Sequence, residues 1–274
     1  MTDSKTEVTL RSETSLAEMP IDLADLQFDA ELGGKIGLKD IAIPYLYILQ
    51  TNSPQCNPDH EKYIAGATAG MLYLTVIEKI WEGRTTGINL VLCYYERLIV
   101  EWIPREAGGG MVGSYPAEDP IMEKAVPNEK KIPTLPNGHN LMDTAYHYLL
   151  VKDPTENRWY QAIMPLKSTA LKVSRRVNSI ISTNMITNTK GEKFIAPRFL
   201  HSWKLTSIKE AKDTNVWSSP KFELNGMVTR EVYSQAKDYA KVAGQDLLRR
   251  APEDPEMAQA AYPKDIDSEA ANEI

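Results

Sequence analysis

The cations of one short segment are the first residues whose types and spacing suggest a chemistry. Residues 167–176 read Lys-Ser-Thr-Ala-Leu-Lys-Val-Ser-Arg-Arg, which places four cations in ten positions. In a helix, Lys172, Arg175 and Arg176 lie on one side, at spacings of three and four. Such a face can neutralise nucleic-acid phosphates, and a guanidinium binds phosphate oxygens as a fork. Taken alone, the segment fits a solvated helix face equally well.

Aromatic side chains recur beside cations elsewhere, as in Tyr94-Tyr95-Glu96-Arg97 and Trp102-Ile103-Pro104-Arg105. Unpaired bases stack on aromatic faces inside a positive groove, at about 1–3 kcal/mol per base. Strand neighbours alternate between faces, so we expect roughly a third of these rings to touch nucleic acid and the others to enter the core. The full set of predicted contacts is Tyr94, Arg97, Trp102, Arg105, Lys167, Lys172, Arg175, Arg176, Trp203, Lys204 and Trp217.

The net charge of −6 conceals an uneven distribution of charge. Residues 1–32 hold eight acidic and two basic side chains, and residues 251–274 hold seven and one, so each end carries −6. Residues 33–250 therefore carry +6, and within them residues 160–212 carry ten basic against two acidic side chains. A basic middle between acidic ends favours a nucleic-acid-binding domain with charged extensions.

The acidic C-terminus has two interpretations. A flexible tail tethered to a basic domain can occupy the positive groove until nucleic acid displaces it, because the tether keeps its local concentration high. The displaced tail would then offer its carboxylates to other proteins. The alternative is an ordinary solubilising terminus. The tail residues expected to bind partners are Asp265, Asp267, Glu269 and Glu273.

Catalytic motifs give little support to an enzyme. The four histidines are scattered, with no HExxH spacing and no pairing with Cys56 or Cys93. There is no GxSxG elbow, and the glycine run at 108–110 lacks the lysine and Ser/Thr of a phosphate-binding loop. We expect no catalysis, no cofactor and no metal.

The elements expected to position these residues make a mainly β chain. Short β-branched and aromatic runs predict strands, two stretches with helical spacing predict helices, and residues 106–140 predict a long irregular loop. The strands are expected at 41–49, 71–77, 88–95, 98–103, 145–152, 158–164, 199–207 and 217–224, and the helices from 168 or 169 and over about 231–250.

The domain organisation follows from composition. Residues 1–32 form a flexible acidic arm, 33–250 the folded domain, and 251–274 the acidic tail. No apolar run is long enough to span a bilayer, and the N-terminus does not have the composition of a secretory signal. Two isolated cysteines fit a reducing cytoplasm, that of the host if the protein is viral.

The order of these features resembles phage-encoded single-stranded-DNA-binding proteins with an OB-fold. The resemblance rests on the strand block, the basic 167–176 segment, the Trp-bearing strands with Asn215-Val216-Trp217, and the acidic end, over about residues 40–250. The stretch Tyr94–Tyr115 also resembles phage proteins of DNA metabolism. The resemblance implies an OB-like barrel with one or two packed helices, which coats single strands and recruits polymerase or helicase through its tail. In several such families the tail ends in an aromatic residue, whereas this chain ends in Ile274.

The expected function is therefore non-sequence-specific binding of single-stranded DNA in phage replication, recombination or repair. Three alternatives remain: a single-strand annealing protein that assembles into rings, a virion structural or assembly protein, and a metal-dependent nuclease with dispersed carboxylates. The sequence leaves open whether the chain forms a homo-oligomer and whether it prefers DNA to RNA.

Overall fold

The computed structural model describes residues 40–245 together with Asp29, Leu32, Gly34, Glu253, Glu256 and Met257. The chain divides into two compact units, 1–37 and 38–274. In the first unit, the backbone N–H of Leu32 donates to the carbonyl of Asp29 at 3.0 Å, which forms a turn. The rest of the predicted arm, and the tail residues Asp265, Asp267, Glu269 and Glu273, lie outside the described residues.

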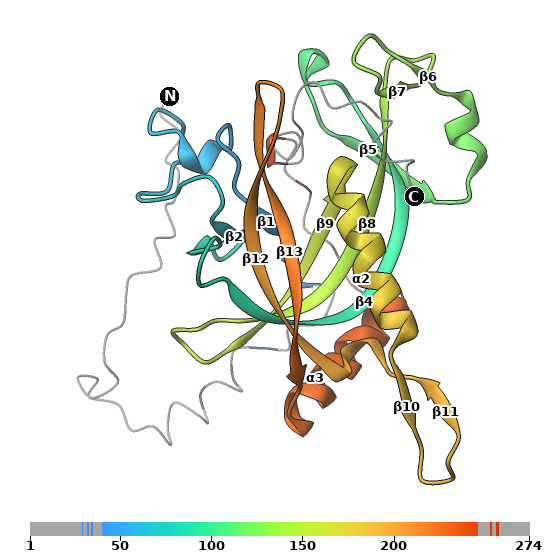
Figure 1. The fold of residues 1–274 in the computed structure, drawn as a ribbon. Helices are drawn as coiled ribbons and strands as arrows, with labels where there is room; N and C mark the ends of the chain where they lie inside the picture. Colours follow the sequence, from blue (N-terminus) through green and yellow to red (C-terminus); the bar gives the residue numbers. More distant parts are fainter. Residues whose placement is uncertain are drawn as a thin grey trace. The chain divides into compact units, whose positions relative to one another are not determined.

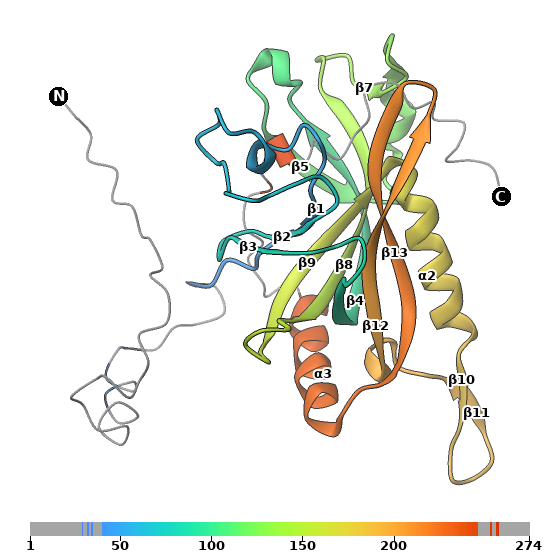
Figure 2. The ribbon, with the colours of Figure 1, turned by 60° about the vertical axis from the view of Figure 1, so that its left-hand side comes forward.

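The second unit is built on one large sheet that curls into a half-barrel (Figures 1 and 2). The strand order is β13-β12-β4-β8-β7-β6, with β9 also pairing with β8 and β5 with β4. The expected mainly β fold with a barrel-like sheet and two helices is confirmed, while the OB-fold stays a prediction. The strand bounds are β4 Ile88–Trp102, β5 Met111–Pro116, β6 Val126–Pro127, β7 Pro133–Thr134, β8 Asn140–Lys152, β9 Trp159–Lys167, β12 His201–Lys212 and β13 Asn215–Met227.

Strand β4 gives the sheet much of its curvature. Two strands were expected here, but β4 is continuous, with register shifts after Leu92 and after Glu101 that bend it. The charged residues at the expected break are paired with β8: the Tyr148 hydroxyl donates to Glu96 at 2.7 Å, and Arg97 forms an ion pair with Asp143. Because these charged side chains find partners on the neighbouring strand β8, they do not interrupt β4.

A small three-stranded sheet lies across the open side of the half-barrel. Its strands are β1 Leu46–Ile48, β2 Leu72–Leu74 and β3 Lys79–Trp81. On one side, Tyr45 forms a parallel bridge with Ile163 of β9. On the other side, the backbone N–H of Ser207 in β12 donates to the carbonyl of Gly83 at 2.7 Å. The two sheets enclose an apolar core that includes Leu46, Leu72, Leu90, Leu149, Ala162 and Trp203.

Two helices pack on this framework. Helix α2, Leu171–Thr183, buries Leu171 and Val177 in the enclosed core. Helix α3, Arg230–Gly244, packs on the outer face of the sheet through Val232, Ala236, Tyr239 and Ala243. Thr229 caps α3 by accepting the backbone N–H of Val232. Both predicted helices form, and the last part of the second predicted helix, residues 246–250, lies outside the described residues.

Two further segments complete the unit. The expected loop 106–140 contains β5, β6, β7 and a 3₁₀ turn, Pro120–Lys124, and it encloses a small core of Ile99, Ile121 and Leu141. A short hairpin of β10, Met185–Thr187, and β11, Lys193–Ile195, follows α2 and pairs with no other described strand.

Candidate nucleic-acid interface

Partly or fully exposed cations lie on α2 and on one face of the β12–β13 hairpin. Directly opposed residues of an antiparallel pair share a face. The register pairs Lys204 with Glu223, Thr206 with Lys221, Glu210 with Trp217 and Lys212 with Asn215, so these residues lie on one side. Helix α2 packs against β13. We call this region the α2–hairpin surface: Lys172, Arg175, Arg176, Lys204, Glu210, Lys212, Trp217, Lys221 and Glu223.

Glu210 joins the helix to the hairpin. Its carboxylate lies 3.3 Å from the Lys172 ammonium and accepts the Trp217 indole N–H at 3.0 Å. The Ser219 hydroxyl donates to the same carboxylate at 2.8 Å. Lys172 and Trp217, two predicted contacts far apart in the sequence, therefore meet at one carboxylate. Glu210 and Ser219 were not predicted, although the alternation of β12 places Glu210 on the face of Lys204.

The α2–hairpin surface is positive and open to water. Helix α2 contributes Lys172, Arg175 and Arg176, and the hairpin contributes Lys204, Lys212 and Lys221, with Glu210 and Glu223 as the acids. The contact that joins the helix to the hairpin is the ion pair of Lys172 with Glu210. The Lys172 side chain is 48% exposed, and the Trp217 ring is half-buried. Ion pairs this exposed contribute little to stability, so an incoming phosphate can exchange with a carboxylate at small cost. This arrangement can bind a polyanion and offer an aromatic ring beside it.

A buried polar network fixes α2 on the sheet. Arg198 donates to His147 Nδ1 and to Asn178 Oδ1 of α2, each at 2.8 Å. Since a guanidinium only donates, His147 Nδ1 accepts, and its Nε2–H donates to Ser174 of α2 at 2.8 Å. Burial holds the pKa of His147 well below its usual value, with Arg198 adding to the effect. Burial likewise lowers the pKa of Arg198 to about 10.

Three other predicted contacts meet in a second region, beneath the start of the C-terminal segment. The Lys167 ammonium forms an ion pair with Glu253, whose other oxygen accepts the Tyr146 hydroxyl at 3.1 Å. The same ammonium lies 4.9 Å from the centre of the Trp102 ring. Burial lowers the pKa of Lys167, and Glu253 opposes that shift. The two charged side chains are 3% and 0% exposed, so this pair belongs to the interior.

Glu256 extends the second region to the surface. Its carboxylate lies 3.0 Å from Lys62, 3.5 Å from His60 and 3.7 Å from Arg105. Met257, one residue further along the chain, is 2% exposed and belongs to the apolar core that also contains the buried residues of α3. We call this region the C-terminal cluster: His60, Lys62, Trp102, Arg105, Tyr146, Lys167, Glu253 and Glu256. The expected tail 251–274 thus includes residues that pack against the domain.

The other predicted contacts lie elsewhere or are buried. Trp102 and Trp203 are 3% and 1% exposed, because each packs into a core, so neither ring face is open to a base. Tyr94 is half-buried and packs edge-on against Tyr148 near the end of α3. The exposed Arg97 side chain forms an ion pair with Asp143 of β8, and within residues 40–245 no hydrogen bond or ion pair joins it to the α2–hairpin surface. These side chains therefore do not converge on one trough, contrary to the expectation from the sequence.

The family of the chain follows from a comparison with protein-family models. Residues 11–246 match the model described as Pam3 phage gp34-like protein. The chain belongs to this phage family. The match spans most of the described domain, including α2, the β12–β13 hairpin and α3. Comparisons with curated proteins and with solved structures returned no match.

The described residues also bear on membrane helices and on metal binding. Within residues 40–245 and the few described outside them, no helix is long and apolar enough to cross a membrane. In that same part of the chain, no group of three or more His, Cys, Asp or Glu side chains is placed to hold a metal ion.

Proposed function

We propose that this member of the gp34-like phage family binds single-stranded DNA without sequence preference, in replication, recombination or repair of phage DNA in the host cytoplasm. It binds without catalysing a reaction. The observation that supports this most is the meeting of Lys172 and Trp217 at Glu210, between the basic helix α2 and the β12–β13 hairpin. Phosphate neutralisation beside a stacking ring is the chemistry by which unpaired strands are held.

The proposed contacts are narrower than the set predicted from the sequence. Arg175 and Arg176 bind phosphates together with Lys172, Lys204 and Lys221, and Trp217 stacks on a base. Glu210 releases Lys172 when a phosphate arrives. The barrel-like β fold is compatible with the OB-fold proteins that the sequence resembles.

The acidic end has two roles in this proposal. Glu253 stabilises the domain through Lys167, whereas residues 258–274 compete with DNA for cations and recruit replication proteins such as polymerase or helicase. That last part holds four acidic side chains, Asp265, Asp267, Glu269 and Glu273, and one lysine.

Tryptophan fluorescence tests the proposal. The chain has five tryptophans, of which Trp81, Trp102 and Trp203 are buried and Trp159 and Trp217 are partly exposed. Titration with oligo-dT at two salt concentrations should quench the emission, more weakly at high salt. The Trp217→Phe variant should lose a large part of the quenching. Absence of quenching and of any mobility shift at low salt would refute single-strand binding.

A further inference from the structure

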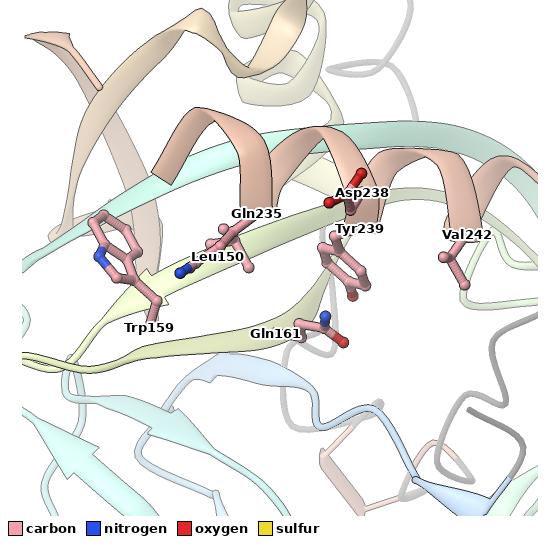
Figure 3. Close-up of a pocket in the computed structure, with 7 residues that line it drawn as sticks. All are labelled: Leu150, Trp159, Gln161, Gln235, Asp238, Tyr239 and Val242. Carbon is pink, nitrogen blue, oxygen red and sulfur yellow. The ribbon is translucent and has the colours of Figure 1, made fainter. Parts of the chain in front are cut away.

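A cavity of about 380 Å³ lies between α3 and the outer face of β8 and β9 (Figure 3). Its volume falls in the range of small-ligand sites. It is lined by Leu150, Trp159, Gln161, Gln235, Asp238, Tyr239 and Val242, none of which belongs to the α2–hairpin surface or to the C-terminal cluster. Two strands and a helix, all fixed by packing, therefore shape the cavity.

The lining follows from the periodicities of the elements. Trp159 and Gln161 are two residues apart in β9, so they point to the same face. Gln235, Asp238 and Val242 are spaced by three and four in α3, so they lie along one stripe. Each element thus presents one glutamine amide, and the indole of Trp159 stands at one end (Figure 3).

The floor of the cavity is apolar and rigid. Leu150 and Tyr239 are 3% and 2% exposed. The Tyr239 hydroxyl donates to the backbone carbonyl of Ala162 at 3.1 Å, so only its ring faces the cavity. A flat apolar ligand can pack against such a floor and against an indole.

The polar groups of the rim are available. Within the described part of the chain, the amides of Gln161 and Gln235 and the indole N–H of Trp159 form no hydrogen bond. The Asp238 carboxylate is a further acceptor, and its contact with Lys241 at 3.4 Å is exposed to solvent. The rim of the cavity thus offers two amides, each of which can donate and accept hydrogen bonds, and the Asp238 carboxylate as a further acceptor. The floor between them is apolar.

We infer that this cavity binds an unpaired nucleobase that carries an exocyclic amino group, which means cytosine, adenine or guanine rather than thymine. Glutamine amides pair with the edges of such bases, carboxylates accept from their amino groups, and unstacked bases are held on aromatic rings. A phosphate is disfavoured, because no cation lines the cavity among the described residues and Asp238 repels it. This inference rests on the proposed function and refines it: the phosphate contacts bind a strand of any sequence, and the cavity adds a preference among the bases.

The test compares oligo-dC, oligo-dA and oligo-dT of equal length at pH 7.5. The full chain should bind oligo-dC and oligo-dA at least about fivefold more tightly than oligo-dT, the equivalent of one bidentate contact. The double variant Gln161→Leu with Gln235→Leu keeps the side-chain volume and should lose this preference while binding oligo-dT unchanged. The control variant Gln245→Leu replaces an exposed glutamine just beyond α3 that does not line the cavity. This variant should keep the preference for oligo-dC and oligo-dA.

The outcomes separate the two proposals. Equal affinity for the three oligonucleotides, or a preference that survives in the double leucine variant, would overturn the base pocket and leave single-strand binding intact. No binding of any oligonucleotide would overturn the proposed function and this inference together. As a second readout, Trp159→Phe should remove the difference in fluorescence quenching between oligo-dC and oligo-dT, and an unchanged difference would also overturn the pocket.

Discussion

The α2–hairpin surface and the C-terminal cluster are made of the same residue types but differ in burial. In the first, Lys172 and Glu210 are 48% and 23% exposed in their side chains. In the second, Lys167 and Glu253 are 3% and 0% exposed. A charge pair in water exchanges partners at small cost, whereas a buried pair holds the fold. The comparison shows that a cation is available to an external anion only where the chain has not already buried it against one of its own acids.

The largest difference between the two regions should appear in the free energy of unfolding when the carboxylate of each ion pair, Lys167–Glu253 or Lys172–Glu210, is replaced in turn. Glu253→Gln leaves Lys167 charged and unpaired in the interior, so the free energy of unfolding should fall by about 3–5 kcal/mol. Glu210→Gln should cost less than about 1 kcal/mol. Urea denaturation measures both. The double variant Lys167→Met with Glu253→Leu should recover most of the loss, and equal effects of the two glutamine substitutions would contradict the comparison.

The next largest effect should come from the arginines of α2. Arg175→Ala with Arg176→Ala removes two phosphate contacts, so the slope of log affinity against log salt should fall by roughly 1.4 and the affinity at 0.1 M salt by about 25-fold. Fluorescence titrations over a salt range provide both values. Lys124→Ala with Lys130→Ala, two exposed cations of the 106–140 segment, is the matched control and should leave the slope unchanged. An unaltered slope in the arginine variant would remove α2 from the interface.

The buried hydrogen bonds of His147 with Arg198 and with Ser174 of α2 should make the stability of the domain depend on pH. The pKa of His147 is depressed in the folded protein, while in the unfolded chain it returns to about 6.5. The unfolded state therefore binds the proton first, so stability is complete above about pH 6.5 and declines as the pH falls, by at most about 1.4 kcal/mol per pH unit. Urea denaturation at pH 7.5, 6.5 and 5.5 measures this. His147→Gln should flatten the dependence, and an identical decline in that variant would assign it to other groups.

The smallest effect should come from the end of the tail. Deleting 258–274 removes four acidic side chains and one lysine but keeps Glu253 and Met257 in place. DNA binding should tighten severalfold at low salt, and the gain should shrink at high salt, because screening weakens the competition. Deleting 251–274 should instead destabilise the domain. Weaker DNA binding by the shorter deletion would refute competition by the tail.

Pattern and local chemistry predicted much of the fold. Helical spacing located α2 and α3, and the β runs at 145–152 and 158–164 located β8 and β9. The sequence predicted two strands where the structure has the single strand β4, because the charged residues Glu96 and Arg97 indicate the end of a strand when their partners on β8 are not known. Such pairing across strands depends on tertiary register, which no local pattern carries.

The candidate site was predicted only in part. The basic helix and Trp217 could be named from charge and aromatic content, but the same criteria selected Trp102, Trp203 and Lys167, which the fold buries. Burial depends on which face of a strand meets the core, and a bulge in β4 reverses that face partway along. The Lys167–Glu253 pair joins residues far apart in the chain, so no local signal could have revealed it.

Photochemical cross-linking tests the central claim most directly, because it reports where a strand touches the protein. An oligo-dT with single 5-iododeoxyuridine substitutions would be irradiated with the full chain, and the adducts located by mass spectrometry. We predict adducts in β13 at Trp217, which disappear when Arg175 and Arg176 are both replaced by alanine. Adducts confined to segments other than α2 and the β12–β13 hairpin would contradict the proposed interface.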